Sequence, residues 1–326
     1  MNYIIDHIQL PPKPFSSRFP FSRNVEILVF GAGAMGSLIG GLLSIRQHVL
    51  LVGRKEHVDA IEAHGLRITG KTTRLVHPHA VTRVPAGGRP DLVIITTKAY
   101  DTAAAMSRLK PFADSAAFLT LQNGLDNPDV IARTARRVIA GTTAHGVTFL
   151  SPGEIRHAGI GDTTIGGWKG VRGEDVIRVR DVLDEAGIRT QIVEDIATEL
   201  WAKVVVNASI NPIAALACVP NGRLVEDADL ARLLDEVGRE ALAAAVADGA
   251  HLDAEDVLRR TRLIARRTAA NRSSMLQDLD RHRRTEVDAI TGAVIRAATR
   301  HGIQTPLNRA LYALVRARET EAAHSG

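Results

Sequence analysis

The chain has 326 residues, of which 45% are hydrophobic and 24% charged, as in soluble globular proteins, and this length suffices for two domains. The net charge of +5 is dispersed: Arg-Arg pairs lie in helical patterns among Asp and Glu without aromatic residues. This argues against a nucleic-acid surface but suits anionic ligands. No uninterrupted apolar run reaches the ~18 residues of a membrane span, so we expect no membrane partner.

The N-terminal segment and the cysteine content bear on localisation. Residues 1–24 carry four prolines and no continuous apolar core, so we expect no secretory signal but a flexible arm, or an upstream start, outside the fold. The single cysteine, Cys218, lies in an apolar run, where we expect a small core residue in a reducing compartment. Both features favour a cytoplasmic protein.

A glycine-rich turn follows the first β-rich run, residues 25–30, and leads into a helical pattern. Gly31, Gly33 and Gly36 have the G-x-G-x-x-G spacing of dinucleotide-binding domains. The first allows the tight turn, the second lets a pyrophosphate approach the backbone, and the third lets the helix pack on the strand. We therefore predict a cofactor-binding loop made of Gly31, Ala32, Gly33, Ala34, Met35 and Gly36.

The second β-rich run, residues 48–54, ends in Gly53 and Arg54, with Lys55 after them. NAD-preferring sites tend to carry Asp or Glu here, and a carboxylate would repel the 2′-phosphate of NADP. A guanidinium binds that phosphate bidentately, so Arg54 favours NADP, although a surface arginine after a strand is the plain alternative.

Further strands are expected along the first half of the chain. Residues 66–69 and 73–76 suggest a small hairpin or peripheral strands, 154–159 and 162–167 a hairpin, and 176–186 a helix before a strand at 189–193. Strands at 91–98 and 116–124 deliver Lys98 and Asn123 to the edge where open α/β sheets bind ligands. A lysine at a strand exit is nevertheless commonplace, and Asn-Gly is usually turn chemistry. After a strand at 138–143, we interpret His145 as structural.

From about residue 195, helical periodicity replaces the β-rich runs, at 196–216, 226–248, 253–268, 284–301 and 306–319. The first helix carries Lys203, Asn207 and Asn211 at i, i+4 and i+8, a polar row on an otherwise apolar helix. Such a helix is buried, and a buried lysine is where pKa values are tuned for proton transfer. The alternative is a half-exposed face with the lysine extended to solvent. We expect Pro212 to kink the helix or bend it just after Asn211.

Two later polar groups have both structural and functional interpretations. Ser273 and Ser274 fit a helix cap, with Gln277 as the capping-box partner of Ser274, or hydroxyls that hold a substrate carboxylate. Glu286 and Asp288 cannot share a helix face, so at most one points into a given site, and either could be a solvated acid.

Together these stretches resemble the ketopantoate reductase (2-dehydropantoate 2-reductase) family. The matching residues run in family order at 31–36, 97–100, 122–124, 199–203, 206–212, 273–278 and 285–288. Of these, 273–278 and 285–288 are specific, whereas many dehydrogenases share the glycine loop. The resemblance implies an α/β Rossmann-type NADP-binding domain at 25–194. It also implies an all-α, 6-phosphogluconate dehydrogenase-like domain for substrate and catalysis at 195–326.

The resemblance also implies residue roles in the NADPH-dependent reduction of 2-dehydropantoate to pantoate in pantothenate and coenzyme A biosynthesis, without a metal. Lys203 would be the general acid and Glu286 would assist it, by binding a substrate hydroxyl or by keeping Lys203 protonated. The substrate would be held by Asn123, Asn207, Asn211 and Ser274. The cofactor would be held by the glycine loop, Arg54, Lys98 and Asn123.

Two alternatives stay open on the sequence alone. The chain could reduce another 2-keto acid with NADPH, or it could be a NADPH-binding sensor without catalysis, which would have no need of a proton donor such as Lys203. Whether it forms a homodimer is also left open.

Overall fold

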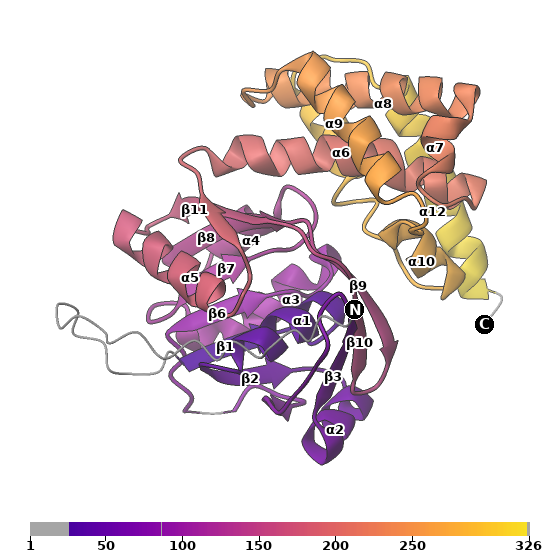
Figure 1. Ribbon diagram of the computed structural model, residues 1–326. Helices are drawn as coiled ribbons and strands as arrows, with labels where there is room; N and C mark the ends of the chain where they lie inside the picture. The colour runs from indigo at the N-terminus through magenta and orange to yellow at the C-terminus, as the bar shows by residue number, and fades with distance from the viewer. Residues whose placement is uncertain (1–25, 86, 325–326) are drawn as a thin grey trace, which may run out of the picture.

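The computed structural model describes residues 26–85 and 87–324 and has a strand-rich part below a helical part (Figure 1). The arm predicted at 1–24 lies outside the described residues. The strands are β1 Glu26–Phe30, β2 His48–Val52, β3 Leu66–Gly70, β4 Arg74–Val76, β5 His79–Val81, β6 Leu92–Ile95, β7 Ala117–Thr120, β8 Arg137–Thr143, β9 Gly146–Ser151, β10 Glu154–Gly159, β11 Thr163–Lys169 and β12 Thr190–Ile192.

Helices connect the strands and then form the second part alone. In the strand-rich part they are α1 Ala34–Leu43, α2 Lys55–His64, η1 Ala99–Asp101, α3 Thr102–Leu109, η2 Lys110–Phe112, α4 Asn127–Ala132 and α5 Gly173–Glu185. In the helical part they are α6 Ile196–Ala217, α7 Arg223–Glu226, α8 Ala228–Ala247, α9 Ala254–Arg267, α10 Ser274–Asp280, α11 Thr291–Arg300 and α12 Pro306–His324.

The main sheet has eight strands in the order β12-β11-β8-β7-β6-β1-β2-β5, parallel throughout except for the β8–β11 pair. Helices cover both faces of this sheet. Successive side chains of a strand point to opposite faces, so the central strands bury side chains in a core on each face. On β1, Ile27 and Val29 pack with α1 and α5, whereas Leu28 and Phe30 pack with α3 and α4. The strand order changes direction between β1 and β6, and open α/β sheets bind ligands beyond the carboxyl ends of the strands at such a point.

A second sheet, in the order β4-β3-β10-β9, packs against α1 in the same core. Its β3–β4 pair is the predicted antiparallel hairpin, but the hairpin predicted at 154–159 and 162–167 is wrong. β10 pairs with β3 and the preceding β9, whereas β11 pairs with β8 in the main sheet. Two neighbouring β-rich runs share the local pattern of a hairpin, but the sheet that buries each strand decides its partner.

Helix α6 is the centre of the helical part. Val204 and Val205 lie in one apolar core and Val206 and Ile210 in another, so the helix is covered on two sides. Its N-cap, Asp195, accepts a hydrogen bond from the Thr198 amide. The helix runs on past Pro212 to Ala217, so the proline does not end it.

By length and composition alone, α6 is apolar enough to cross a bilayer, and 78% of its most apolar 18-residue window is buried inside the protein. Glu199 and Lys203 interrupt the apolar residues of α6, which is why no uninterrupted apolar run in the sequence reaches the length of a membrane span. Burial of this extent is typical of a core helix.

Two local predictions in the helical part are wrong. Cys218 is exposed and ends α6 with φ of 56°, although its apolar surroundings suggested a core residue. The helix predicted at 284–301 starts only at Thr291. Before it, the Thr285 hydroxyl donates to Glu319 and accepts from the Val287 amide, side-chain bonds that compete with helix formation.

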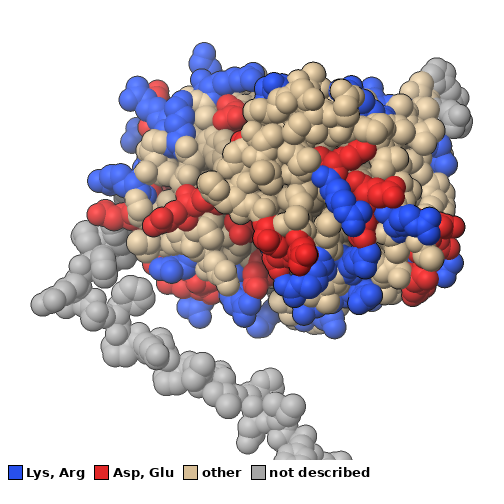
Figure 2. Space-filling model, turned by 90° about the horizontal axis from the view of Figure 1, so that it is seen from above, with Lys and Arg blue, Asp and Glu red and all other residues tan. Residues whose placement is uncertain are grey.

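The dispersed charge forms ion pairs between helices. Arg262 of α9 pairs with Asp235 of α8, and Arg300 of α11 pairs with Asp248 at the end of α8. Figure 2, which looks down on the helical part, shows acidic and basic side chains interspersed over that face.

Candidate active site

The glycine loop between β1 and α1 shows why each glycine is needed. Gly31 has φ of +111°, and a Cβ there would lie 2.6 Å from the Thr97 amide nitrogen. A Cβ on Gly36 would lie 2.2 Å from the Gly31 carbonyl oxygen. On Gly33 its nearest neighbour would be 4.0 Å away, so this position leaves room for a ligand to approach.

The N-terminus of α1 meets the requirements of an anion site. Gly33 is its N-cap, and no acidic residue lies in its first turn. In the part of the chain that the structure describes, no group accepts a hydrogen bond from the amides of Ala34, Met35 or Gly36. Free amides at the positive end of a helix suit a pyrophosphate, so the residues present fit a dinucleotide.

A buried histidine joins the first turns of α1 and α2. His57 Nδ1 accepts a hydrogen bond from the Gly153 amide at 2.9 Å, so Nε2 carries the ring hydrogen and donates to Ser37 Oγ at 2.8 Å. Burial lowers the pKa of His57, which keeps the ring neutral for both bonds. Arg54 is the N-cap of α2, the helix that carries His57.

The polar row of α6 lies as its spacing predicts. Lys203 Nζ donates to the carbonyl oxygen of Thr143, the last residue of β8, at 3.1 Å. Asn211 is buried and Asn207 half-buried, and neither amide has a hydrogen-bond partner among the described residues. Two unpartnered amides on the same helix face as a half-buried ammonium are suited to a polar ligand, because polar groups removed from water are otherwise paired.

The ammonium of Lys203 has an altered acidity. Burial lowers its pKa to about 8, while the Glu286 carboxylate acts in the opposite direction and raises it. The two groups form no ion pair within 4 Å among the described residues, so Glu286 acts on Lys203 through its field.

Glu286 joins the helical part to the sheet edge. It is 6% exposed, and its carboxylate accepts hydrogen bonds from the Ala99 amide at 3.0 Å and from Asn123 Nδ2 at 3.1 Å. Lys98 Nζ lies 3.6 Å from the same carboxylate. These contacts come from the ends of β6 and β7, so the turn before α11 is fixed against the carboxyl edge of the main sheet.

Lys98 joins a second carboxylate of the helical part. Its Nζ donates to Asp278 of α10 at 2.6 Å. Burial lowers the pKa of Lys98, but Glu286 and Asp278 outweigh it, so the pKa is raised and the ammonium stays charged. One cation therefore balances two buried carboxylates between the two parts of the chain.

Ser273, not Ser274, caps α10, so the predicted capping box is wrong. Ser273 Oγ accepts from the Leu276 amide at 3.2 Å, while Gln277 donates to the Arg272 carbonyl. Ser274 is exposed, and its hydroxyl has no partner among the described residues. It precedes Asp278 by one helical turn and so shares its face of α10.

Glu286 and Asp288 lie in different surroundings, although the helix on which that expectation rested begins only at Thr291. Asp288 accepts from Tyr312 and pairs with Arg284, away from the contacts of Glu286. His145 is buried against His157, with 3.0 Å between their ring nitrogens, in keeping with a structural role.

Comparison with known proteins assigns the family. The description "Ketopantoate reductase PanE/ApbA" matches residues 27–170, and "Ketopantoate reductase PanE/ApbA C terminal" matches residues 195–319. A 2-dehydropantoate 2-reductase from Pyrococcus horikoshii is 38% identical over 299 residues, which cover 91% of this chain and 98% of the relative. The chain belongs to the ketopantoate reductase family.

Solved structures agree with this assignment. A PanE/ApbA family ketopantoate reductase from Ralstonia eutropha JMP134 superposes with a TM-score of 0.85 at 33% identity, covering 92% of this chain and all of that one. D-mandelate dehydrogenase with NADH and anilino(oxo)acetate also gives a TM-score of 0.85, at 25% identity, covering 92% of this chain and 99% of that one. The predicted Rossmann-type domain followed by a helical domain is confirmed. Ketopantoate reductases are NADP-dependent oxidoreductases.

Two contacts of this site were not assigned from the sequence. Thr143 contributes only its carbonyl oxygen, which any residue at the end of β8 would offer. Asp278 lies in a stretch that matches the family, but its partner Lys98 is 180 residues away. The opposite charges of Lys98 and Asp278 could be seen in the sequence, but nothing in the sequence indicated that the two residues lie close together.

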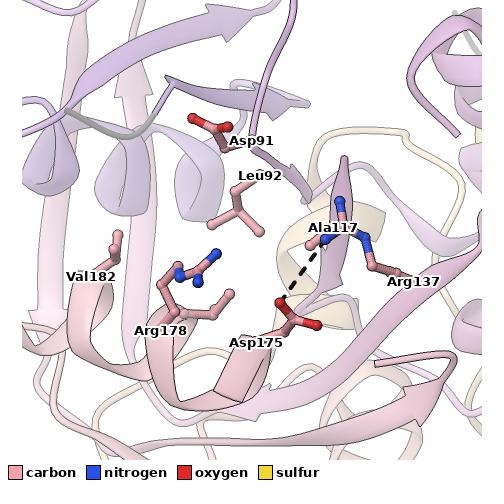
Figure 3. A pocket seen from close by; sticks show the side chains of 8 residues that line it. Asp91, Leu92, Ala117, Arg137, Asp175, Arg178 and Val182 are labelled. Atoms are coloured by element: carbon pink, nitrogen blue, oxygen red, sulfur yellow. Dashed lines mark ion pairs between the residues drawn. The ribbon is translucent and has the colours of Figure 1, made fainter. Parts of the chain in front are cut away.

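A small pocket lies away from this site (Figure 3). Its lining includes Asp91, Ala117 and Arg137, which stand at the amino ends of β6, β7 and β8, and Arg137 lies 4.0 Å from Asp175 of α5. The volume is ≈ 40 Å³, space for about one or two water molecules and not for a substrate.

The glycine geometry yields a paired prediction. Gly33→Ala should keep the thermal stability of the wild type but weaken NADPH binding more than about tenfold, because its methyl group points into the space for the pyrophosphate. Gly36→Ala should lose both, because its methyl group would meet the Gly31 backbone. Thermal denaturation and NADPH fluorescence titration check this, and unchanged binding in Gly33→Ala would contradict it.

Proposed function

We propose that this chain reduces 2-dehydropantoate (ketopantoate) to pantoate with NADPH, with residues 25–194 as the cofactor domain and 195–326 as the catalytic domain. The observation that carries the proposal is the half-buried Lys203, whose ammonium is held by the Thr143 carbonyl at the carboxyl edge of the sheet. The family membership and the match of the whole fold to ketopantoate reductases support it.

Reduction of a 2-keto group requires a hydride, a cation near the keto oxygen and a proton donor, and Lys203 of the polar row can supply the last two. When bound, NADPH supplies the hydride that reduces the 2-keto carbon. Lys203 stabilises the negative charge that develops on the keto oxygen and donates a proton to it, leaving a hydroxyl group and a neutral amine that regains a proton from solvent. A pKa of about 8 suits this task, because the amine is charged at neutral pH yet gives up its proton readily.

Neighbouring side chains would orient the substrate. Asn207 and Asn211 can donate and accept hydrogen bonds without adding charge, and both lack protein partners among the described residues. Ser274 offers a free hydroxyl for the substrate carboxylate. Asn123, bonded to Glu286, would contact both substrate and cofactor.

Glu286 would act mainly as an electrostatic partner of Lys203. Its carboxylate already accepts from Ala99 and Asn123, and its charge raises the pKa of Lys203. Of the two roles open on the sequence, keeping Lys203 protonated is therefore the better supported one.

The likeness to D-mandelate dehydrogenase supports a second candidate, the reduction of another 2-keto acid. A panel of 2-keto acids, each followed by oxidation of NADPH and of NADH, separates the two. Preference for any acid over ketopantoate favours the second candidate. We propose the cytoplasm as the compartment and a small soluble molecule as the substrate, in line with the single cysteine.

Removal of the proton donor gives the first functional prediction. Lys203→Ala should lower kcat for ketopantoate by about 10²–10⁴-fold, because the developing oxyanion loses its general acid, while NADPH binding is retained. The exposed Lys110→Ala is the matched control and should match the wild type. Near-normal turnover in Lys203→Ala would reject its role, and NADPH binding by the wild type without turnover of any keto acid would favour a sensor.

The pH dependence of the reaction gives the second functional prediction. Lys203 must be protonated to act as an acid, so kcat/KM should fall as the pH rises through about 8. Glu286→Gln removes the charge that raises this pKa, so the basic limb should move to lower pH, whatever the absolute rate. A limb that stays in place or moves upward in Glu286→Gln would contradict the electrostatic role.

A further inference from the structure

Two arginines, Arg54 and Arg83, follow the carboxyl ends of two adjacent strands of the main sheet. β2 and β5 are parallel, with Val52 opposite Val81, and the Gly53 amide donates to the Val81 carbonyl at 3.0 Å. Arg54 and Arg83 each follow their paired valine by two residues. Neighbouring strands lie about 4.8 Å apart, so both residues lie beyond the same carboxyl edge of the sheet, past adjacent strands.

In the described part of the chain, neither guanidinium has a hydrogen-bond or ion-pair partner. Arg54 and Arg83 are both exposed, and among the described residues no carboxylate or carbonyl accepts from either side chain. Two like charges at one sheet edge repel each other unless an anion lies between them.

A hollow of ≈ 390 Å³ lies between α2 and the end of β5. The hollow is open to solvent; Val58 and Val81 contribute apolar wall, and Thr82 and Arg83 contribute polar lining. Lys55 and Asp59 also line it, but Lys55 Nζ and the Asp59 carboxylate pair at 2.6 Å. They neutralise each other, so Arg83 in the hollow and Arg54, which directly precedes α2, remain as uncompensated charge.

We propose that Arg83 is a second ligand of the 2′-phosphate of NADP(H), on the opposite side from Arg54, and that the hollow holds this phosphate. The assignment rests on the proposed use of NADPH. A phosphomonoester carries about −1.5 to −2 charges, which two guanidiniums balance where one does not. Arg83 would therefore set the preference for NADPH over NADH without touching the reacting atoms.

The test compares two nucleotides that differ by the 2′-phosphate alone. Adenosine 2′,5′-bisphosphate and 5′-AMP are titrated calorimetrically into the full chain, as wild type, Arg54→Ala, Arg83→Ala, Arg83→Lys and Arg239→Ala. Arg239 is an exposed arginine of α8 and is the matched control. No keto acid is present, so the readout does not depend on turnover.

Arg83→Ala should weaken the bisphosphate by about 10- to 100-fold and 5′-AMP by less than about twofold, because a charged hydrogen bond to the 2′-phosphate is lost. Arg83→Lys should restore part of the difference, and Arg239→Ala should bind both as the wild type does. Arg83→Ala should also show a higher KM for NADPH and an unchanged KM for NADH.

Three results would overturn the assignment. Arg83→Ala could bind the bisphosphate as tightly as the wild type while Arg54→Ala does not, it could weaken both nucleotides equally, or the wild type could fail to prefer the bisphosphate. If the nucleotide result is as expected but ketopantoate is not reduced, the proposed reaction fails and the phosphate site stands.

Discussion

The structure depends on one half-buried cation whose charge is only partly compensated. The Lys203 ammonium has three hydrogens, and among the described residues one group, the Thr143 carbonyl, accepts one of them. Removal from water lowers its pKa, and the field of Glu286 limits that fall. A charge in this state is stabilised further by any acceptor that arrives beside it. The geometry therefore favours a ligand with a polarisable oxygen, which is what a 2-keto acid offers.

That compensation requires the two parts of the chain to stay together. Glu286 comes from the turn before α11, yet it is held by Ala99 and Asn123 from the sheet edge. Lys98 adds charge balance, because it lies between Glu286 and Asp278 and keeps two buried carboxylates from repelling each other. The same lysine and asparagine lie at the strand ends where a Rossmann fold binds its nicotinamide nucleotide. Contacts that fix the domains thus also fix the position of the acid relative to the cofactor.

Periodicity and loop chemistry were sufficient to predict the glycine loop, the parallel sheet and the polar row of α6, because each depends on residues close in sequence. They did not predict the position of Glu286, since its turn is set by a contact with Glu319 and by the distant sheet edge. The Thr143 carbonyl and the Asp278 pairing were missed because a backbone group has no sequence signal and a charge pair needs proximity. The choice of Ser273 as cap depended on a one-residue shift that composition does not resolve.

The acidity of Lys203 itself is the most direct test of this account. The sequence contains seven lysines, so ¹³Cε-lysine labelling and NMR titration of the wild type and of Lys203→Met can assign and follow each one. One lysine signal should titrate with a pKa of about 8 and should be missing from the Lys203→Met spectrum. If the signal lost in Lys203→Met titrates at the ordinary value of 10.5 or above, the ammonium is not held in the environment described and the proposed acid catalysis is contradicted.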